Sequence, residues 1–247
     1  MIEQNQGNDR PSRDISRRGF VSRASVTGIA LAVPTWLAAQ QRGGSAPKKP
    51  EQEEDVAPPE DLMREHGVLK RVLLIYEEGI RRVESKQQLP PDSVKNSAQI
   101  IRSFIEDYHE KLEEDHLFPR FEKAKKLTDL TVVLRAQHQA GRTLTDQITQ
   151  LATAASLKDP SSASKLRDAM RQFVRMYAPH EAREDTVLFP ALRSVVSKNE
   201  FDALGEDFEK KEHELFGEDG FEKMVDRVAT IERTLGIYDL AQFTPHV

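Results

Sequence analysis

HEKLEEDHLFP, at residues 109–119, and HEAREDTVLFP, at residues 180–190, are two copies of one eleven-residue pattern. Both follow the pattern H-E-x-x-E-[ED]-x-x-L-F-P. In an α-helix, a His and a Glu four residues apart lie on the same face, one turn apart. Two such helices that face each other would direct two imidazoles and two carboxylates at one point. The repeat therefore predicts two helices that share a site for a pair of metal ions.

Helical periodicity extends over most of the chain after residue 57. Apolar residues at spacings of three and four predict six helices, at about residues 58–86, 92–119, 128–155, 162–190, 200–216 and 221–235. No strand-like alternation longer than a few residues interrupts them. We therefore expect an all-α fold, with an antiparallel four-helix bundle at residues 58–198 and a C-terminal helical extension at residues 199–247.

The first forty residues resemble a twin-arginine-type export signal. The motif SRRGFV at residues 16–21 is followed by a weakly apolar run at residues 24–39. This run is too short and too interrupted for a membrane span, so we expect no stable span once the signal is removed. An uncleaved anchor and a basic disordered tail are the alternatives. The resemblance implies an exported, periplasmic or otherwise extracytoplasmic protein. Residues 41–57 have the composition of a disordered linker.

Composition narrows the possible functions. The 247 residues include 36 basic and 41 acidic ones, for a net charge of −5, which offers no electrostatic case for a nucleic-acid partner. The chain has no cysteine, which excludes disulfides, thiolate ligands and haem attachment through C-x-x-C-H. A metal must therefore be held by His and carboxylate side chains, which suit iron, manganese or zinc.

One His is expected in the core from each bundle helix, and two of the helices add a Glu. A single His on an apolar stripe is usually a core residue, but four of them with two otherwise unpaired carboxylates favour a metal site, because buried unpaired carboxylates are costly. Four imidazoles, two bridging carboxylates and one bridging oxide or hydroxide leave two six-coordinate ions unsaturated. An external small ligand could therefore bind. The predicted metal ligands are His66, His109, Glu113, His138, His180 and Glu184.

This ordered set, with Leu-Phe-Pro after both Glu residues, resembles the hemerythrin-like, or HHE cation-binding, family over about residues 57–200. The resemblance implies a centre of two non-haem iron ions with an oxo or hydroxo bridge, reactive towards O2, H2O2 or NO as small-molecule partners. Manganese or zinc is a weaker expectation. By the same resemblance, His66 and His109 serve one iron, His138 and His180 serve the other, and Glu113 and Glu184 bridge them.

Two departures from the oxygen-carrying members bear on function. Those proteins have a second His one turn after the third-helix His, where this chain has Arg142. They also have an Asp bridge five residues after its His, whereas Glu184 lies four residues after His180. The loss of a nitrogen ligand favours peroxide or nitrogen-oxide chemistry over reversible oxygen carriage.

Three further residues are open to two interpretations. His116 is either a catalytic residue, which supports the site by a hydrogen bond near Glu113 or donates a proton to bound peroxide, or an exposed His at a helix end. Pro179 either kinks its helix and re-aims His180 or has no role. Tyr177 either packs in the core, which is the simpler interpretation, or lines the pocket or forms a radical. His213 and His246 are expected to be solvated and terminal, respectively.

Four functions remain to be weighed. The first is a di-iron oxidoreductase that handles peroxide or oxygen, and the second is a sensor or iron-buffering module without turnover. A third function, a bundle that binds haem through two histidines, would leave both predicted bridging glutamates without a metal partner. A zinc hydrolase would need H-E-x-x-H, which the motif lacks. The sequence leaves open whether the protein is an enzyme.

Overall fold

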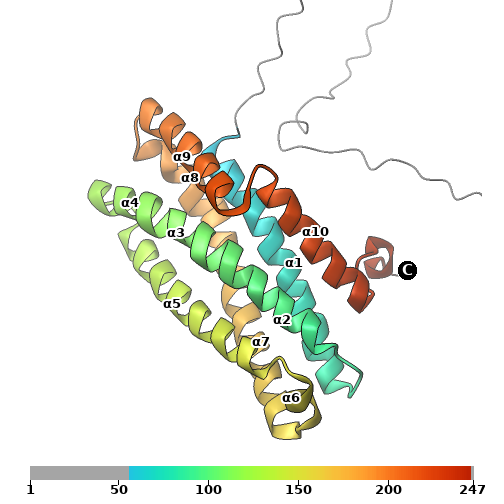
Figure 1. Ribbon diagram of the computed structural model, residues 1–247. Helices are drawn as coiled ribbons and strands as arrows, with labels where there is room; N and C mark the ends of the chain where they lie inside the picture. Colours follow the sequence, from blue (N-terminus) through green and yellow to red (C-terminus); the bar gives the residue numbers. More distant parts are fainter. Residues whose placement is uncertain (1–55, 246–247) are drawn as a thin grey trace, which may run out of the picture. The chain divides into compact units, whose positions relative to one another are not determined.

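The computed structural model describes residues 56–245, so the predicted export signal, most of the predicted linker and His246 lie outside the described residues. All regular elements among residues 56–245 are helices (Figure 1), which confirms the all-α prediction. Four long helical segments run alternately up and down to form the bundle. They are α1 (Pro58–Glu84), the segment from α2 (Pro91–Ile100) to α4 (Phe118–Ala124), α5 (Thr128–Leu151), and α7 (Pro160–Arg183) with its continuation.

The helix ends follow from local sequence chemistry. α1 begins with prolines in its first turn, where a missing N–H breaks no helical hydrogen bond. Glu60 and Asp61 follow, and their negative charges interact favourably with the positive end of the helix dipole. α7 begins after Asp159, whose carboxylate accepts the backbone N–H of Ser162 at 2.8 Å. A short helix, α6 (Ala154–Lys158), precedes it. α7 continues through Pro179.

The helices that carry the repeated motif contain π-helical turns, which the periodicity did not predict. In the second segment these are η2 (Ile101–His109) and η3 (Glu113–Leu117), on either side of α3 (Glu110–Leu112). After α7 come η4 (Glu184–Leu188), α8 (Phe189–Ala191) and a 3-10 turn, η5 (Leu192–Ser194).

Two of these π turns begin at the motif glutamates and end just before the motif prolines. The N–H of Phe118 bonds to the carbonyl of Glu113, five residues back, and Phe189 does the same with Glu184. A proline inside a helix has no N–H to donate, and its ring clashes with the carbonyl four residues back. We infer that the wider turn accommodates the proline, so that the helix continues past the Leu-Phe-Pro of each motif.

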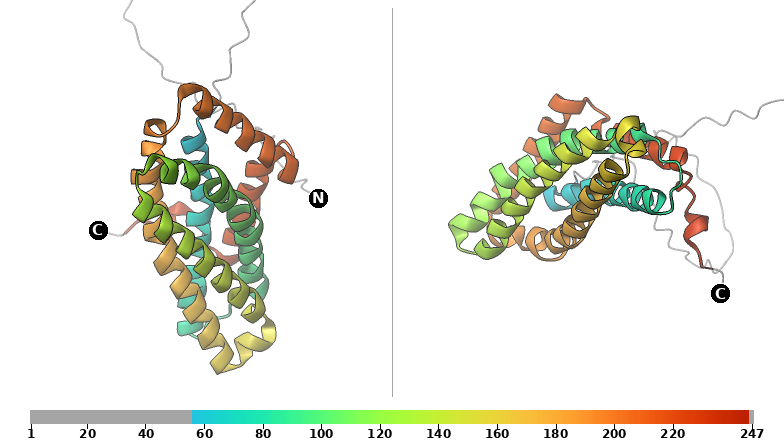
Figure 2. Two further views of the ribbon diagram at one scale, coloured as in Figure 1. Left: turned by 90° about the vertical axis from the view of Figure 1, so that its left-hand side faces the viewer. Right: turned by 90° about the horizontal axis from the view of Figure 1, so that it is seen from below.

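The C-terminal extension covers one side of the bundle. It consists of α9 (Lys198–Phe216), α10 (Gly220–Leu235) and a final 3-10 turn, η6 (Leu240–Phe243). α10 packs on α1 and α2, and α9 packs on α1 (Figure 2). Aromatic rings form part of the junction, since Phe216 lies edge-on to Phe104 with ring centroids 5.6 Å apart. The extension thus adds a layer to the bundle beyond its four helices.

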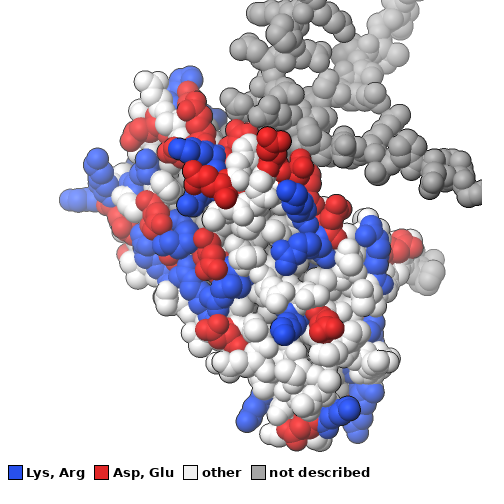
Figure 3. All heavy atoms as spheres, in the orientation of Figure 1, with Lys and Arg blue, Asp and Glu red and all other residues white. Residues whose placement is uncertain are grey.

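On the face drawn in Figure 3, basic and acidic side chains are interspersed. Among residues 56–245, none of the helices combines the length and the apolar character that crossing a membrane requires.

Candidate metal centre

The six predicted ligands come together inside the bundle, and all are buried. His66 comes from α1, His138 from α5 and His180 from α7, while His109 and the two glutamates come from the ends of π turns. They form two groups in which one ligand atom of each residue lies within 4.8 Å of the others: His66 with His109 and Glu113, and His138 with His180 and Glu184. The structure thus brings the predicted set into one place.

The four imidazoles form two pairs whose Nε2 atoms face each other. The Nε2 atoms of His66 and His109 are 3.0 Å apart, and those of His138 and His180 are 3.3 Å apart. Two imidazole nitrogens at this separation need either a proton or a cation between them, because two facing lone pairs repel each other. Each pair therefore marks a position that a metal ion could take.

Glu113 and Glu184 each span both pairs. The two oxygens of Glu113 lie 3.7 Å from Nε2 of His109 and 3.4 Å from Nε2 of His138. One oxygen of Glu184 lies 3.4 Å from Nε2 of His66 and 3.2 Å from Nε2 of His180. All four oxygens of the two glutamates are buried, and none of them has a hydrogen-bond partner among residues 56–245. Such an arrangement is costly in a protein interior unless a cation compensates the charge.

The outer nitrogen of every imidazole has its own acceptor. Nδ1 of His66 donates to Asp185 at 2.7 Å, and Nδ1 of His138 donates to Glu114 at 3.0 Å. An ionised carboxylate can only accept a hydrogen bond, so these contacts place the proton on Nδ1 and leave the lone pair on Nε2 for a metal.

The imidazoles of His109 and His180 also donate from Nδ1 to a side chain of another helix. Nδ1 of His109 donates to Glu65 at 2.7 Å, and Nδ1 of His180 donates to the amide oxygen of Gln137 at 2.8 Å. Glu65 comes directly before His66 in the sequence, and Gln137 comes directly before His138.

Each motif also supplies a phenylalanine that stacks on an imidazole from another helix. The ring of Phe118 lies on His138 with centroids 5.6 Å apart, and the ring of Phe189 lies on His66 with centroids 5.4 Å apart. The two rings are buried. In each motif, the Phe and the acidic residue directly after the motif Glu contact the same imidazole of a neighbouring helix, and together they orient it. The [ED] position and the Phe of the repeated pattern thus have a structural role.

Cations pair with the carboxylates around the centre. Arg142 lies 2.8 Å from Glu110 and 2.9 Å from Glu114. Arg142, four residues after His138, is therefore engaged in ion pairs with two acidic residues of the first motif. Tyr177 also donates to Glu110, at 2.7 Å, and so has a polar partner besides its packing. The hydroxyl fits over Gly141, where a Cβ would lie 2.0 Å from it.

The pKa values show how the protein balances this buried charge without a metal. Burial and the charge of Glu184 raise the pKa of Glu113 well above its usual range. Burial alone would also raise the pKa of Glu184, but His180 and His66 outweigh it and lower that pKa. Burial opposes the charge on His66, but its hydrogen bond to Asp185 and the nearby negative charge of Glu184 raise its pKa to about 9. Protons thus stand where metal charge would otherwise be, and metal binding would release them.

The donor set fits a metal. Imidazole nitrogens and carboxylate oxygens suit iron, manganese or zinc, and the unpartnered oxygens of Glu113 and Glu184 lie between the two imidazole pairs. That these six residues bind metal stays a prediction that the geometry supports.

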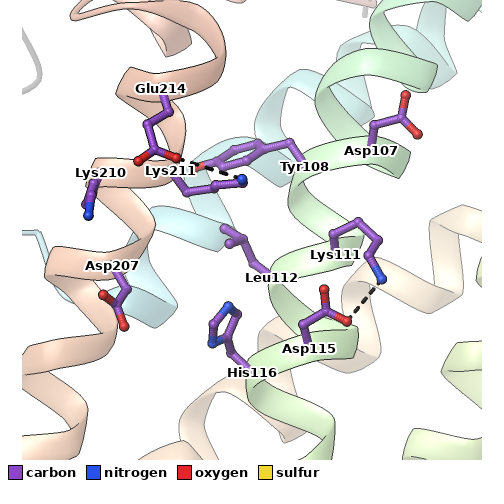
Figure 4. Close-up of a pocket in the computed structure, with 10 residues that line it drawn as sticks. All are labelled: Asp107, Tyr108, Lys111, Leu112, Asp115, His116, Asp207, Lys210, Lys211 and Glu214. Carbon is purple, nitrogen blue, oxygen red and sulfur yellow. Dashed lines mark hydrogen bonds and ion pairs between the residues drawn. The ribbon is translucent and has the colours of Figure 1, made fainter.

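His116 lies in a different place from the six. It lines a cleft of about 280 Å³ between its own helix and α9, together with residues such as Lys111 and Asp207 (Figure 4). Its ring is edge-on to Phe208 of α9, with centroids 5.7 Å apart. Within residues 56–245, no hydrogen bond or ion pair joins it to the six predicted ligands. His213 lies on α9, 4.0 Å from Glu209.

The sequence interpretation missed the residues that orient the imidazoles. Two of them could have been found, because Glu114 and Asp185 occupy the repeated acidic position of the motif. Glu65 and Gln137 occupy the same position, directly before a His, but they differ in residue type and accept from an imidazole of another helix, so only the fold reveals their role. The missed residues are Glu65, Glu114, Gln137 and Asp185, with the stacking rings of Phe118 and Phe189.

A helical bundle with buried imidazole pairs and spanning carboxylates defines a cation-binding protein, and comparison with known families agrees. The family model of the hemerythrin HHE cation-binding domain matches residues 57–159 and 133–244. The chain belongs to this family. It is 53% identical to uncharacterized proteins of Mycobacterium tuberculosis and Mycobacterium bovis over 237 residues, covering 95% of this chain and 93% of each relative. No solved structure matches it significantly.

Proposed function

We propose that the bundle holds two iron ions at a carboxylate-bridged centre that binds or reacts with dioxygen, hydrogen peroxide or nitric oxide. His66 and His109 would hold one ion, His138 and His180 the other, and Glu113 and Glu184 would bridge them. Two iron ions bound in this way would exchange electrons with a small oxidant.

The observation that carries this proposal is the arrangement of the eight inner donor atoms. The four Nε2 atoms converge in pairs, and the Nδ1 atoms of the same rings donate to other acceptors. Within the part of the chain that the structure describes, the four oxygens of Glu113 and Glu184 have no hydrogen-bond partner. A single closed structural ion would use one imidazole pair and leave the other facing pair without a cation. Two ions satisfy both.

The surroundings limit the ligand to a small molecule. All six proposed ligands are buried, and Phe118 and Phe189 cover two of the imidazoles with apolar rings. With Arg142 engaged by Glu110 and Glu114, the chain supplies one nitrogen ligand fewer than the oxygen carriers, which favours an open position for peroxide or a nitrogen oxide.

The test is the metal content of the purified full chain, measured by metal mass spectrometry, with an optical spectrum before and after addition of peroxide. We expect two irons per chain and a bridged-ferric absorption that changes when peroxide is added, with evolution of oxygen. One zinc per chain, or no iron after reconstitution under anaerobic conditions, would refute the proposal.

The same site supports a second candidate, a sensor or iron buffer without turnover. The buried position of all six residues favours it, since a binding protein needs no rapid exchange of substrate and product. Two irons per chain, with a spectrum that responds to oxidant but without catalytic loss of peroxide, would select this candidate over the enzyme.

We also propose that residues 1–40 export the protein by a twin-arginine-type pathway, on the strength of the SRRGFV motif alone. Replacing Arg17 and Arg18 by Lys should retain the protein in the cytoplasm, as measured by cell fractionation. The matched change of Arg10 and Arg13 to Lys lies outside the motif and should leave export unchanged. Equal export of both variants would contradict the proposal.

A further inference from the structure

The residues around the centre follow an approximate twofold relation. Asp185 and Glu114 accept from His66 and His138, and Phe189 and Phe118 stack on the same two rings. Two basic side chains follow the same twofold relation. Lys70 and Arg142 each lie four residues after one of those histidines, and each pairs with two acidic residues of a motif.

The relation fails at one of the four imidazole acceptors. The residue before His66 is Glu65, whose carboxylate accepts from His109, whereas the residue before His138 is Gln137, whose neutral amide accepts from His180. The imidazoles of one half, His66 and His109, are therefore backed by two carboxylates. Those of the other half are backed by one carboxylate and one amide.

The cations add to the difference. Arg142 is 18% exposed and lies within 2.9 Å of Glu114, so it strongly offsets the charge of that acceptor. Lys70 is 52% exposed and lies 3.3 Å from Asp185, so solvent screens more of its charge. Glu65, the acceptor of His109, is fully buried and also accepts the hydroxyl of Tyr108 at 3.0 Å.

A carboxylate that accepts the Nδ1–H draws the proton towards itself and raises the basicity of Nε2, and residues in this position typically change metal affinity about 10–100-fold. Resting on the two-metal function proposed above, we infer that Glu65 and Gln137 are positioning residues that make the two halves unequal. The half formed by His66 and His109 binds its metal first and more tightly.

The test is an anaerobic titration of the metal-free full chain with cobalt(II), followed by its visible absorption. Two cobalt ions should bind in two steps whose dissociation constants differ by about 10–100-fold. Glu65→Gln should weaken the first step, and Gln137→Glu should tighten the second. The double variant, Glu65→Gln with Gln137→Glu, should restore two separated steps in the opposite order.

The order of binding is read from variants that disable one half. In the wild-type background, His180→Ala should keep the tight step and His109→Ala should lose it. In the double variant, Glu65→Gln with Gln137→Glu, His109→Ala should keep the tight step and His180→Ala should lose it. Glu77→Gln and Gln139→Glu, which make the same chemical changes at exposed positions of α1 and α5, should alter neither step. Circular dichroism of the metal-free variants checks that they fold.

The outcomes separate the two proposals. Two cobalt ions with equal affinities that neither Glu65→Gln nor Gln137→Glu changes would overturn the inequality and leave the two-metal function standing. A tight step that survives in His109→Ala but not in His180→Ala would also overturn it. Binding of a single cobalt ion by the wild-type chain would refute the two-metal function, and the inequality with it.

Discussion

Asp185 accepts the Nδ1–H of His66 at 2.7 Å, although the two residues are 119 positions apart in the sequence. Asp185 directly follows Glu184 in the second motif, so one helix supplies both a proposed bridge and the residue that aims a histidine of α1. Glu114 of the first motif holds His138 in the same way. Each motif thus orients an imidazole that it does not contain.

Replacing Asp185 by Asn tests this orienting role. The amide keeps an acceptor for His66 but loses the charge, so we expect metal affinity to fall by about 10–100-fold, with the loss in the half that contains His66. The measurement is a metal titration of the metal-free chain. Asp115→Asn is the matched control, because Asp115 is exposed and pairs with Lys111. Equal affinity in both variants would contradict the role.

Glu184→Ala tests the proposed bridge. We expect loss of bound metal, because this carboxylate spans His66 and His180. We also expect the metal-free protein to be destabilised by about 1–3 kcal/mol, since both buried imidazoles lose the negative charge beside their Nε2 atoms. Metal content per chain and thermal unfolding are the measurements. Glu218→Ala, at an exposed position, should change neither. A Glu184→Ala protein that still carries two irons would refute the assignment.

The metal-free protein should lose stability as the pH rises from about 6.5 to 9. The raised pKa of His66, about 9, means that the folded protein holds this proton more tightly than the unfolded chain does. The contribution is complete below the unfolded pKa of about 6.5 and is lost as the pH rises through 9, on the order of 3 kcal/mol. Burial raises the pKa of Glu110 to about 8, which acts in the same direction.

Thermal unfolding of the metal-free chain at several pH values between 6.5 and 9 measures this loss. Below pH 6.5 the trend is mixed, because burial lowers the pKa of His138 to about 4 and so opposes the effect of Glu110. A His66→Gln variant should show a much flatter dependence between pH 6.5 and 9. A wild-type midpoint that rises over this interval would contradict the sign.

Gly141→Ala tests the packing that places Tyr177. The new methyl group would lie 2.0 Å from the Tyr177 hydroxyl, so the ring must move and its bond to Glu110 is lost. We expect a destabilisation of about 1–3 kcal/mol, measured by chemical unfolding. Gly67→Ala is the control, because nothing lies within 4 Å of that Cβ and alanine favours a helix interior by about 1 kcal/mol. Destabilisation of both variants alike would contradict the explanation.

Much of the candidate site follows from the sequence because the motif has helical spacing. A His and a Glu four residues apart must share a helix face, so His109 with Glu113 and His180 with Glu184 could be paired without a structure. The apolar periodicity likewise indicates which face of each long helix turns inward. The exact path of the motif helices could not be predicted, because apolar spacing does not distinguish a π turn from an α turn within so few residues.

The all-α class, the helices of the bundle and the candidate ligands could be predicted from the sequence, because apolar periodicity and the two His–Glu pairs identify the inward face of each helix. Which acceptor holds each imidazole, and where His116 points, became known only from the packing of the helices. Those relations join residues as far apart as Glu65 and His109, or His116 and Phe208. Helical periodicity specifies that a face is buried, but the partner on that face depends on how the helices are placed against each other.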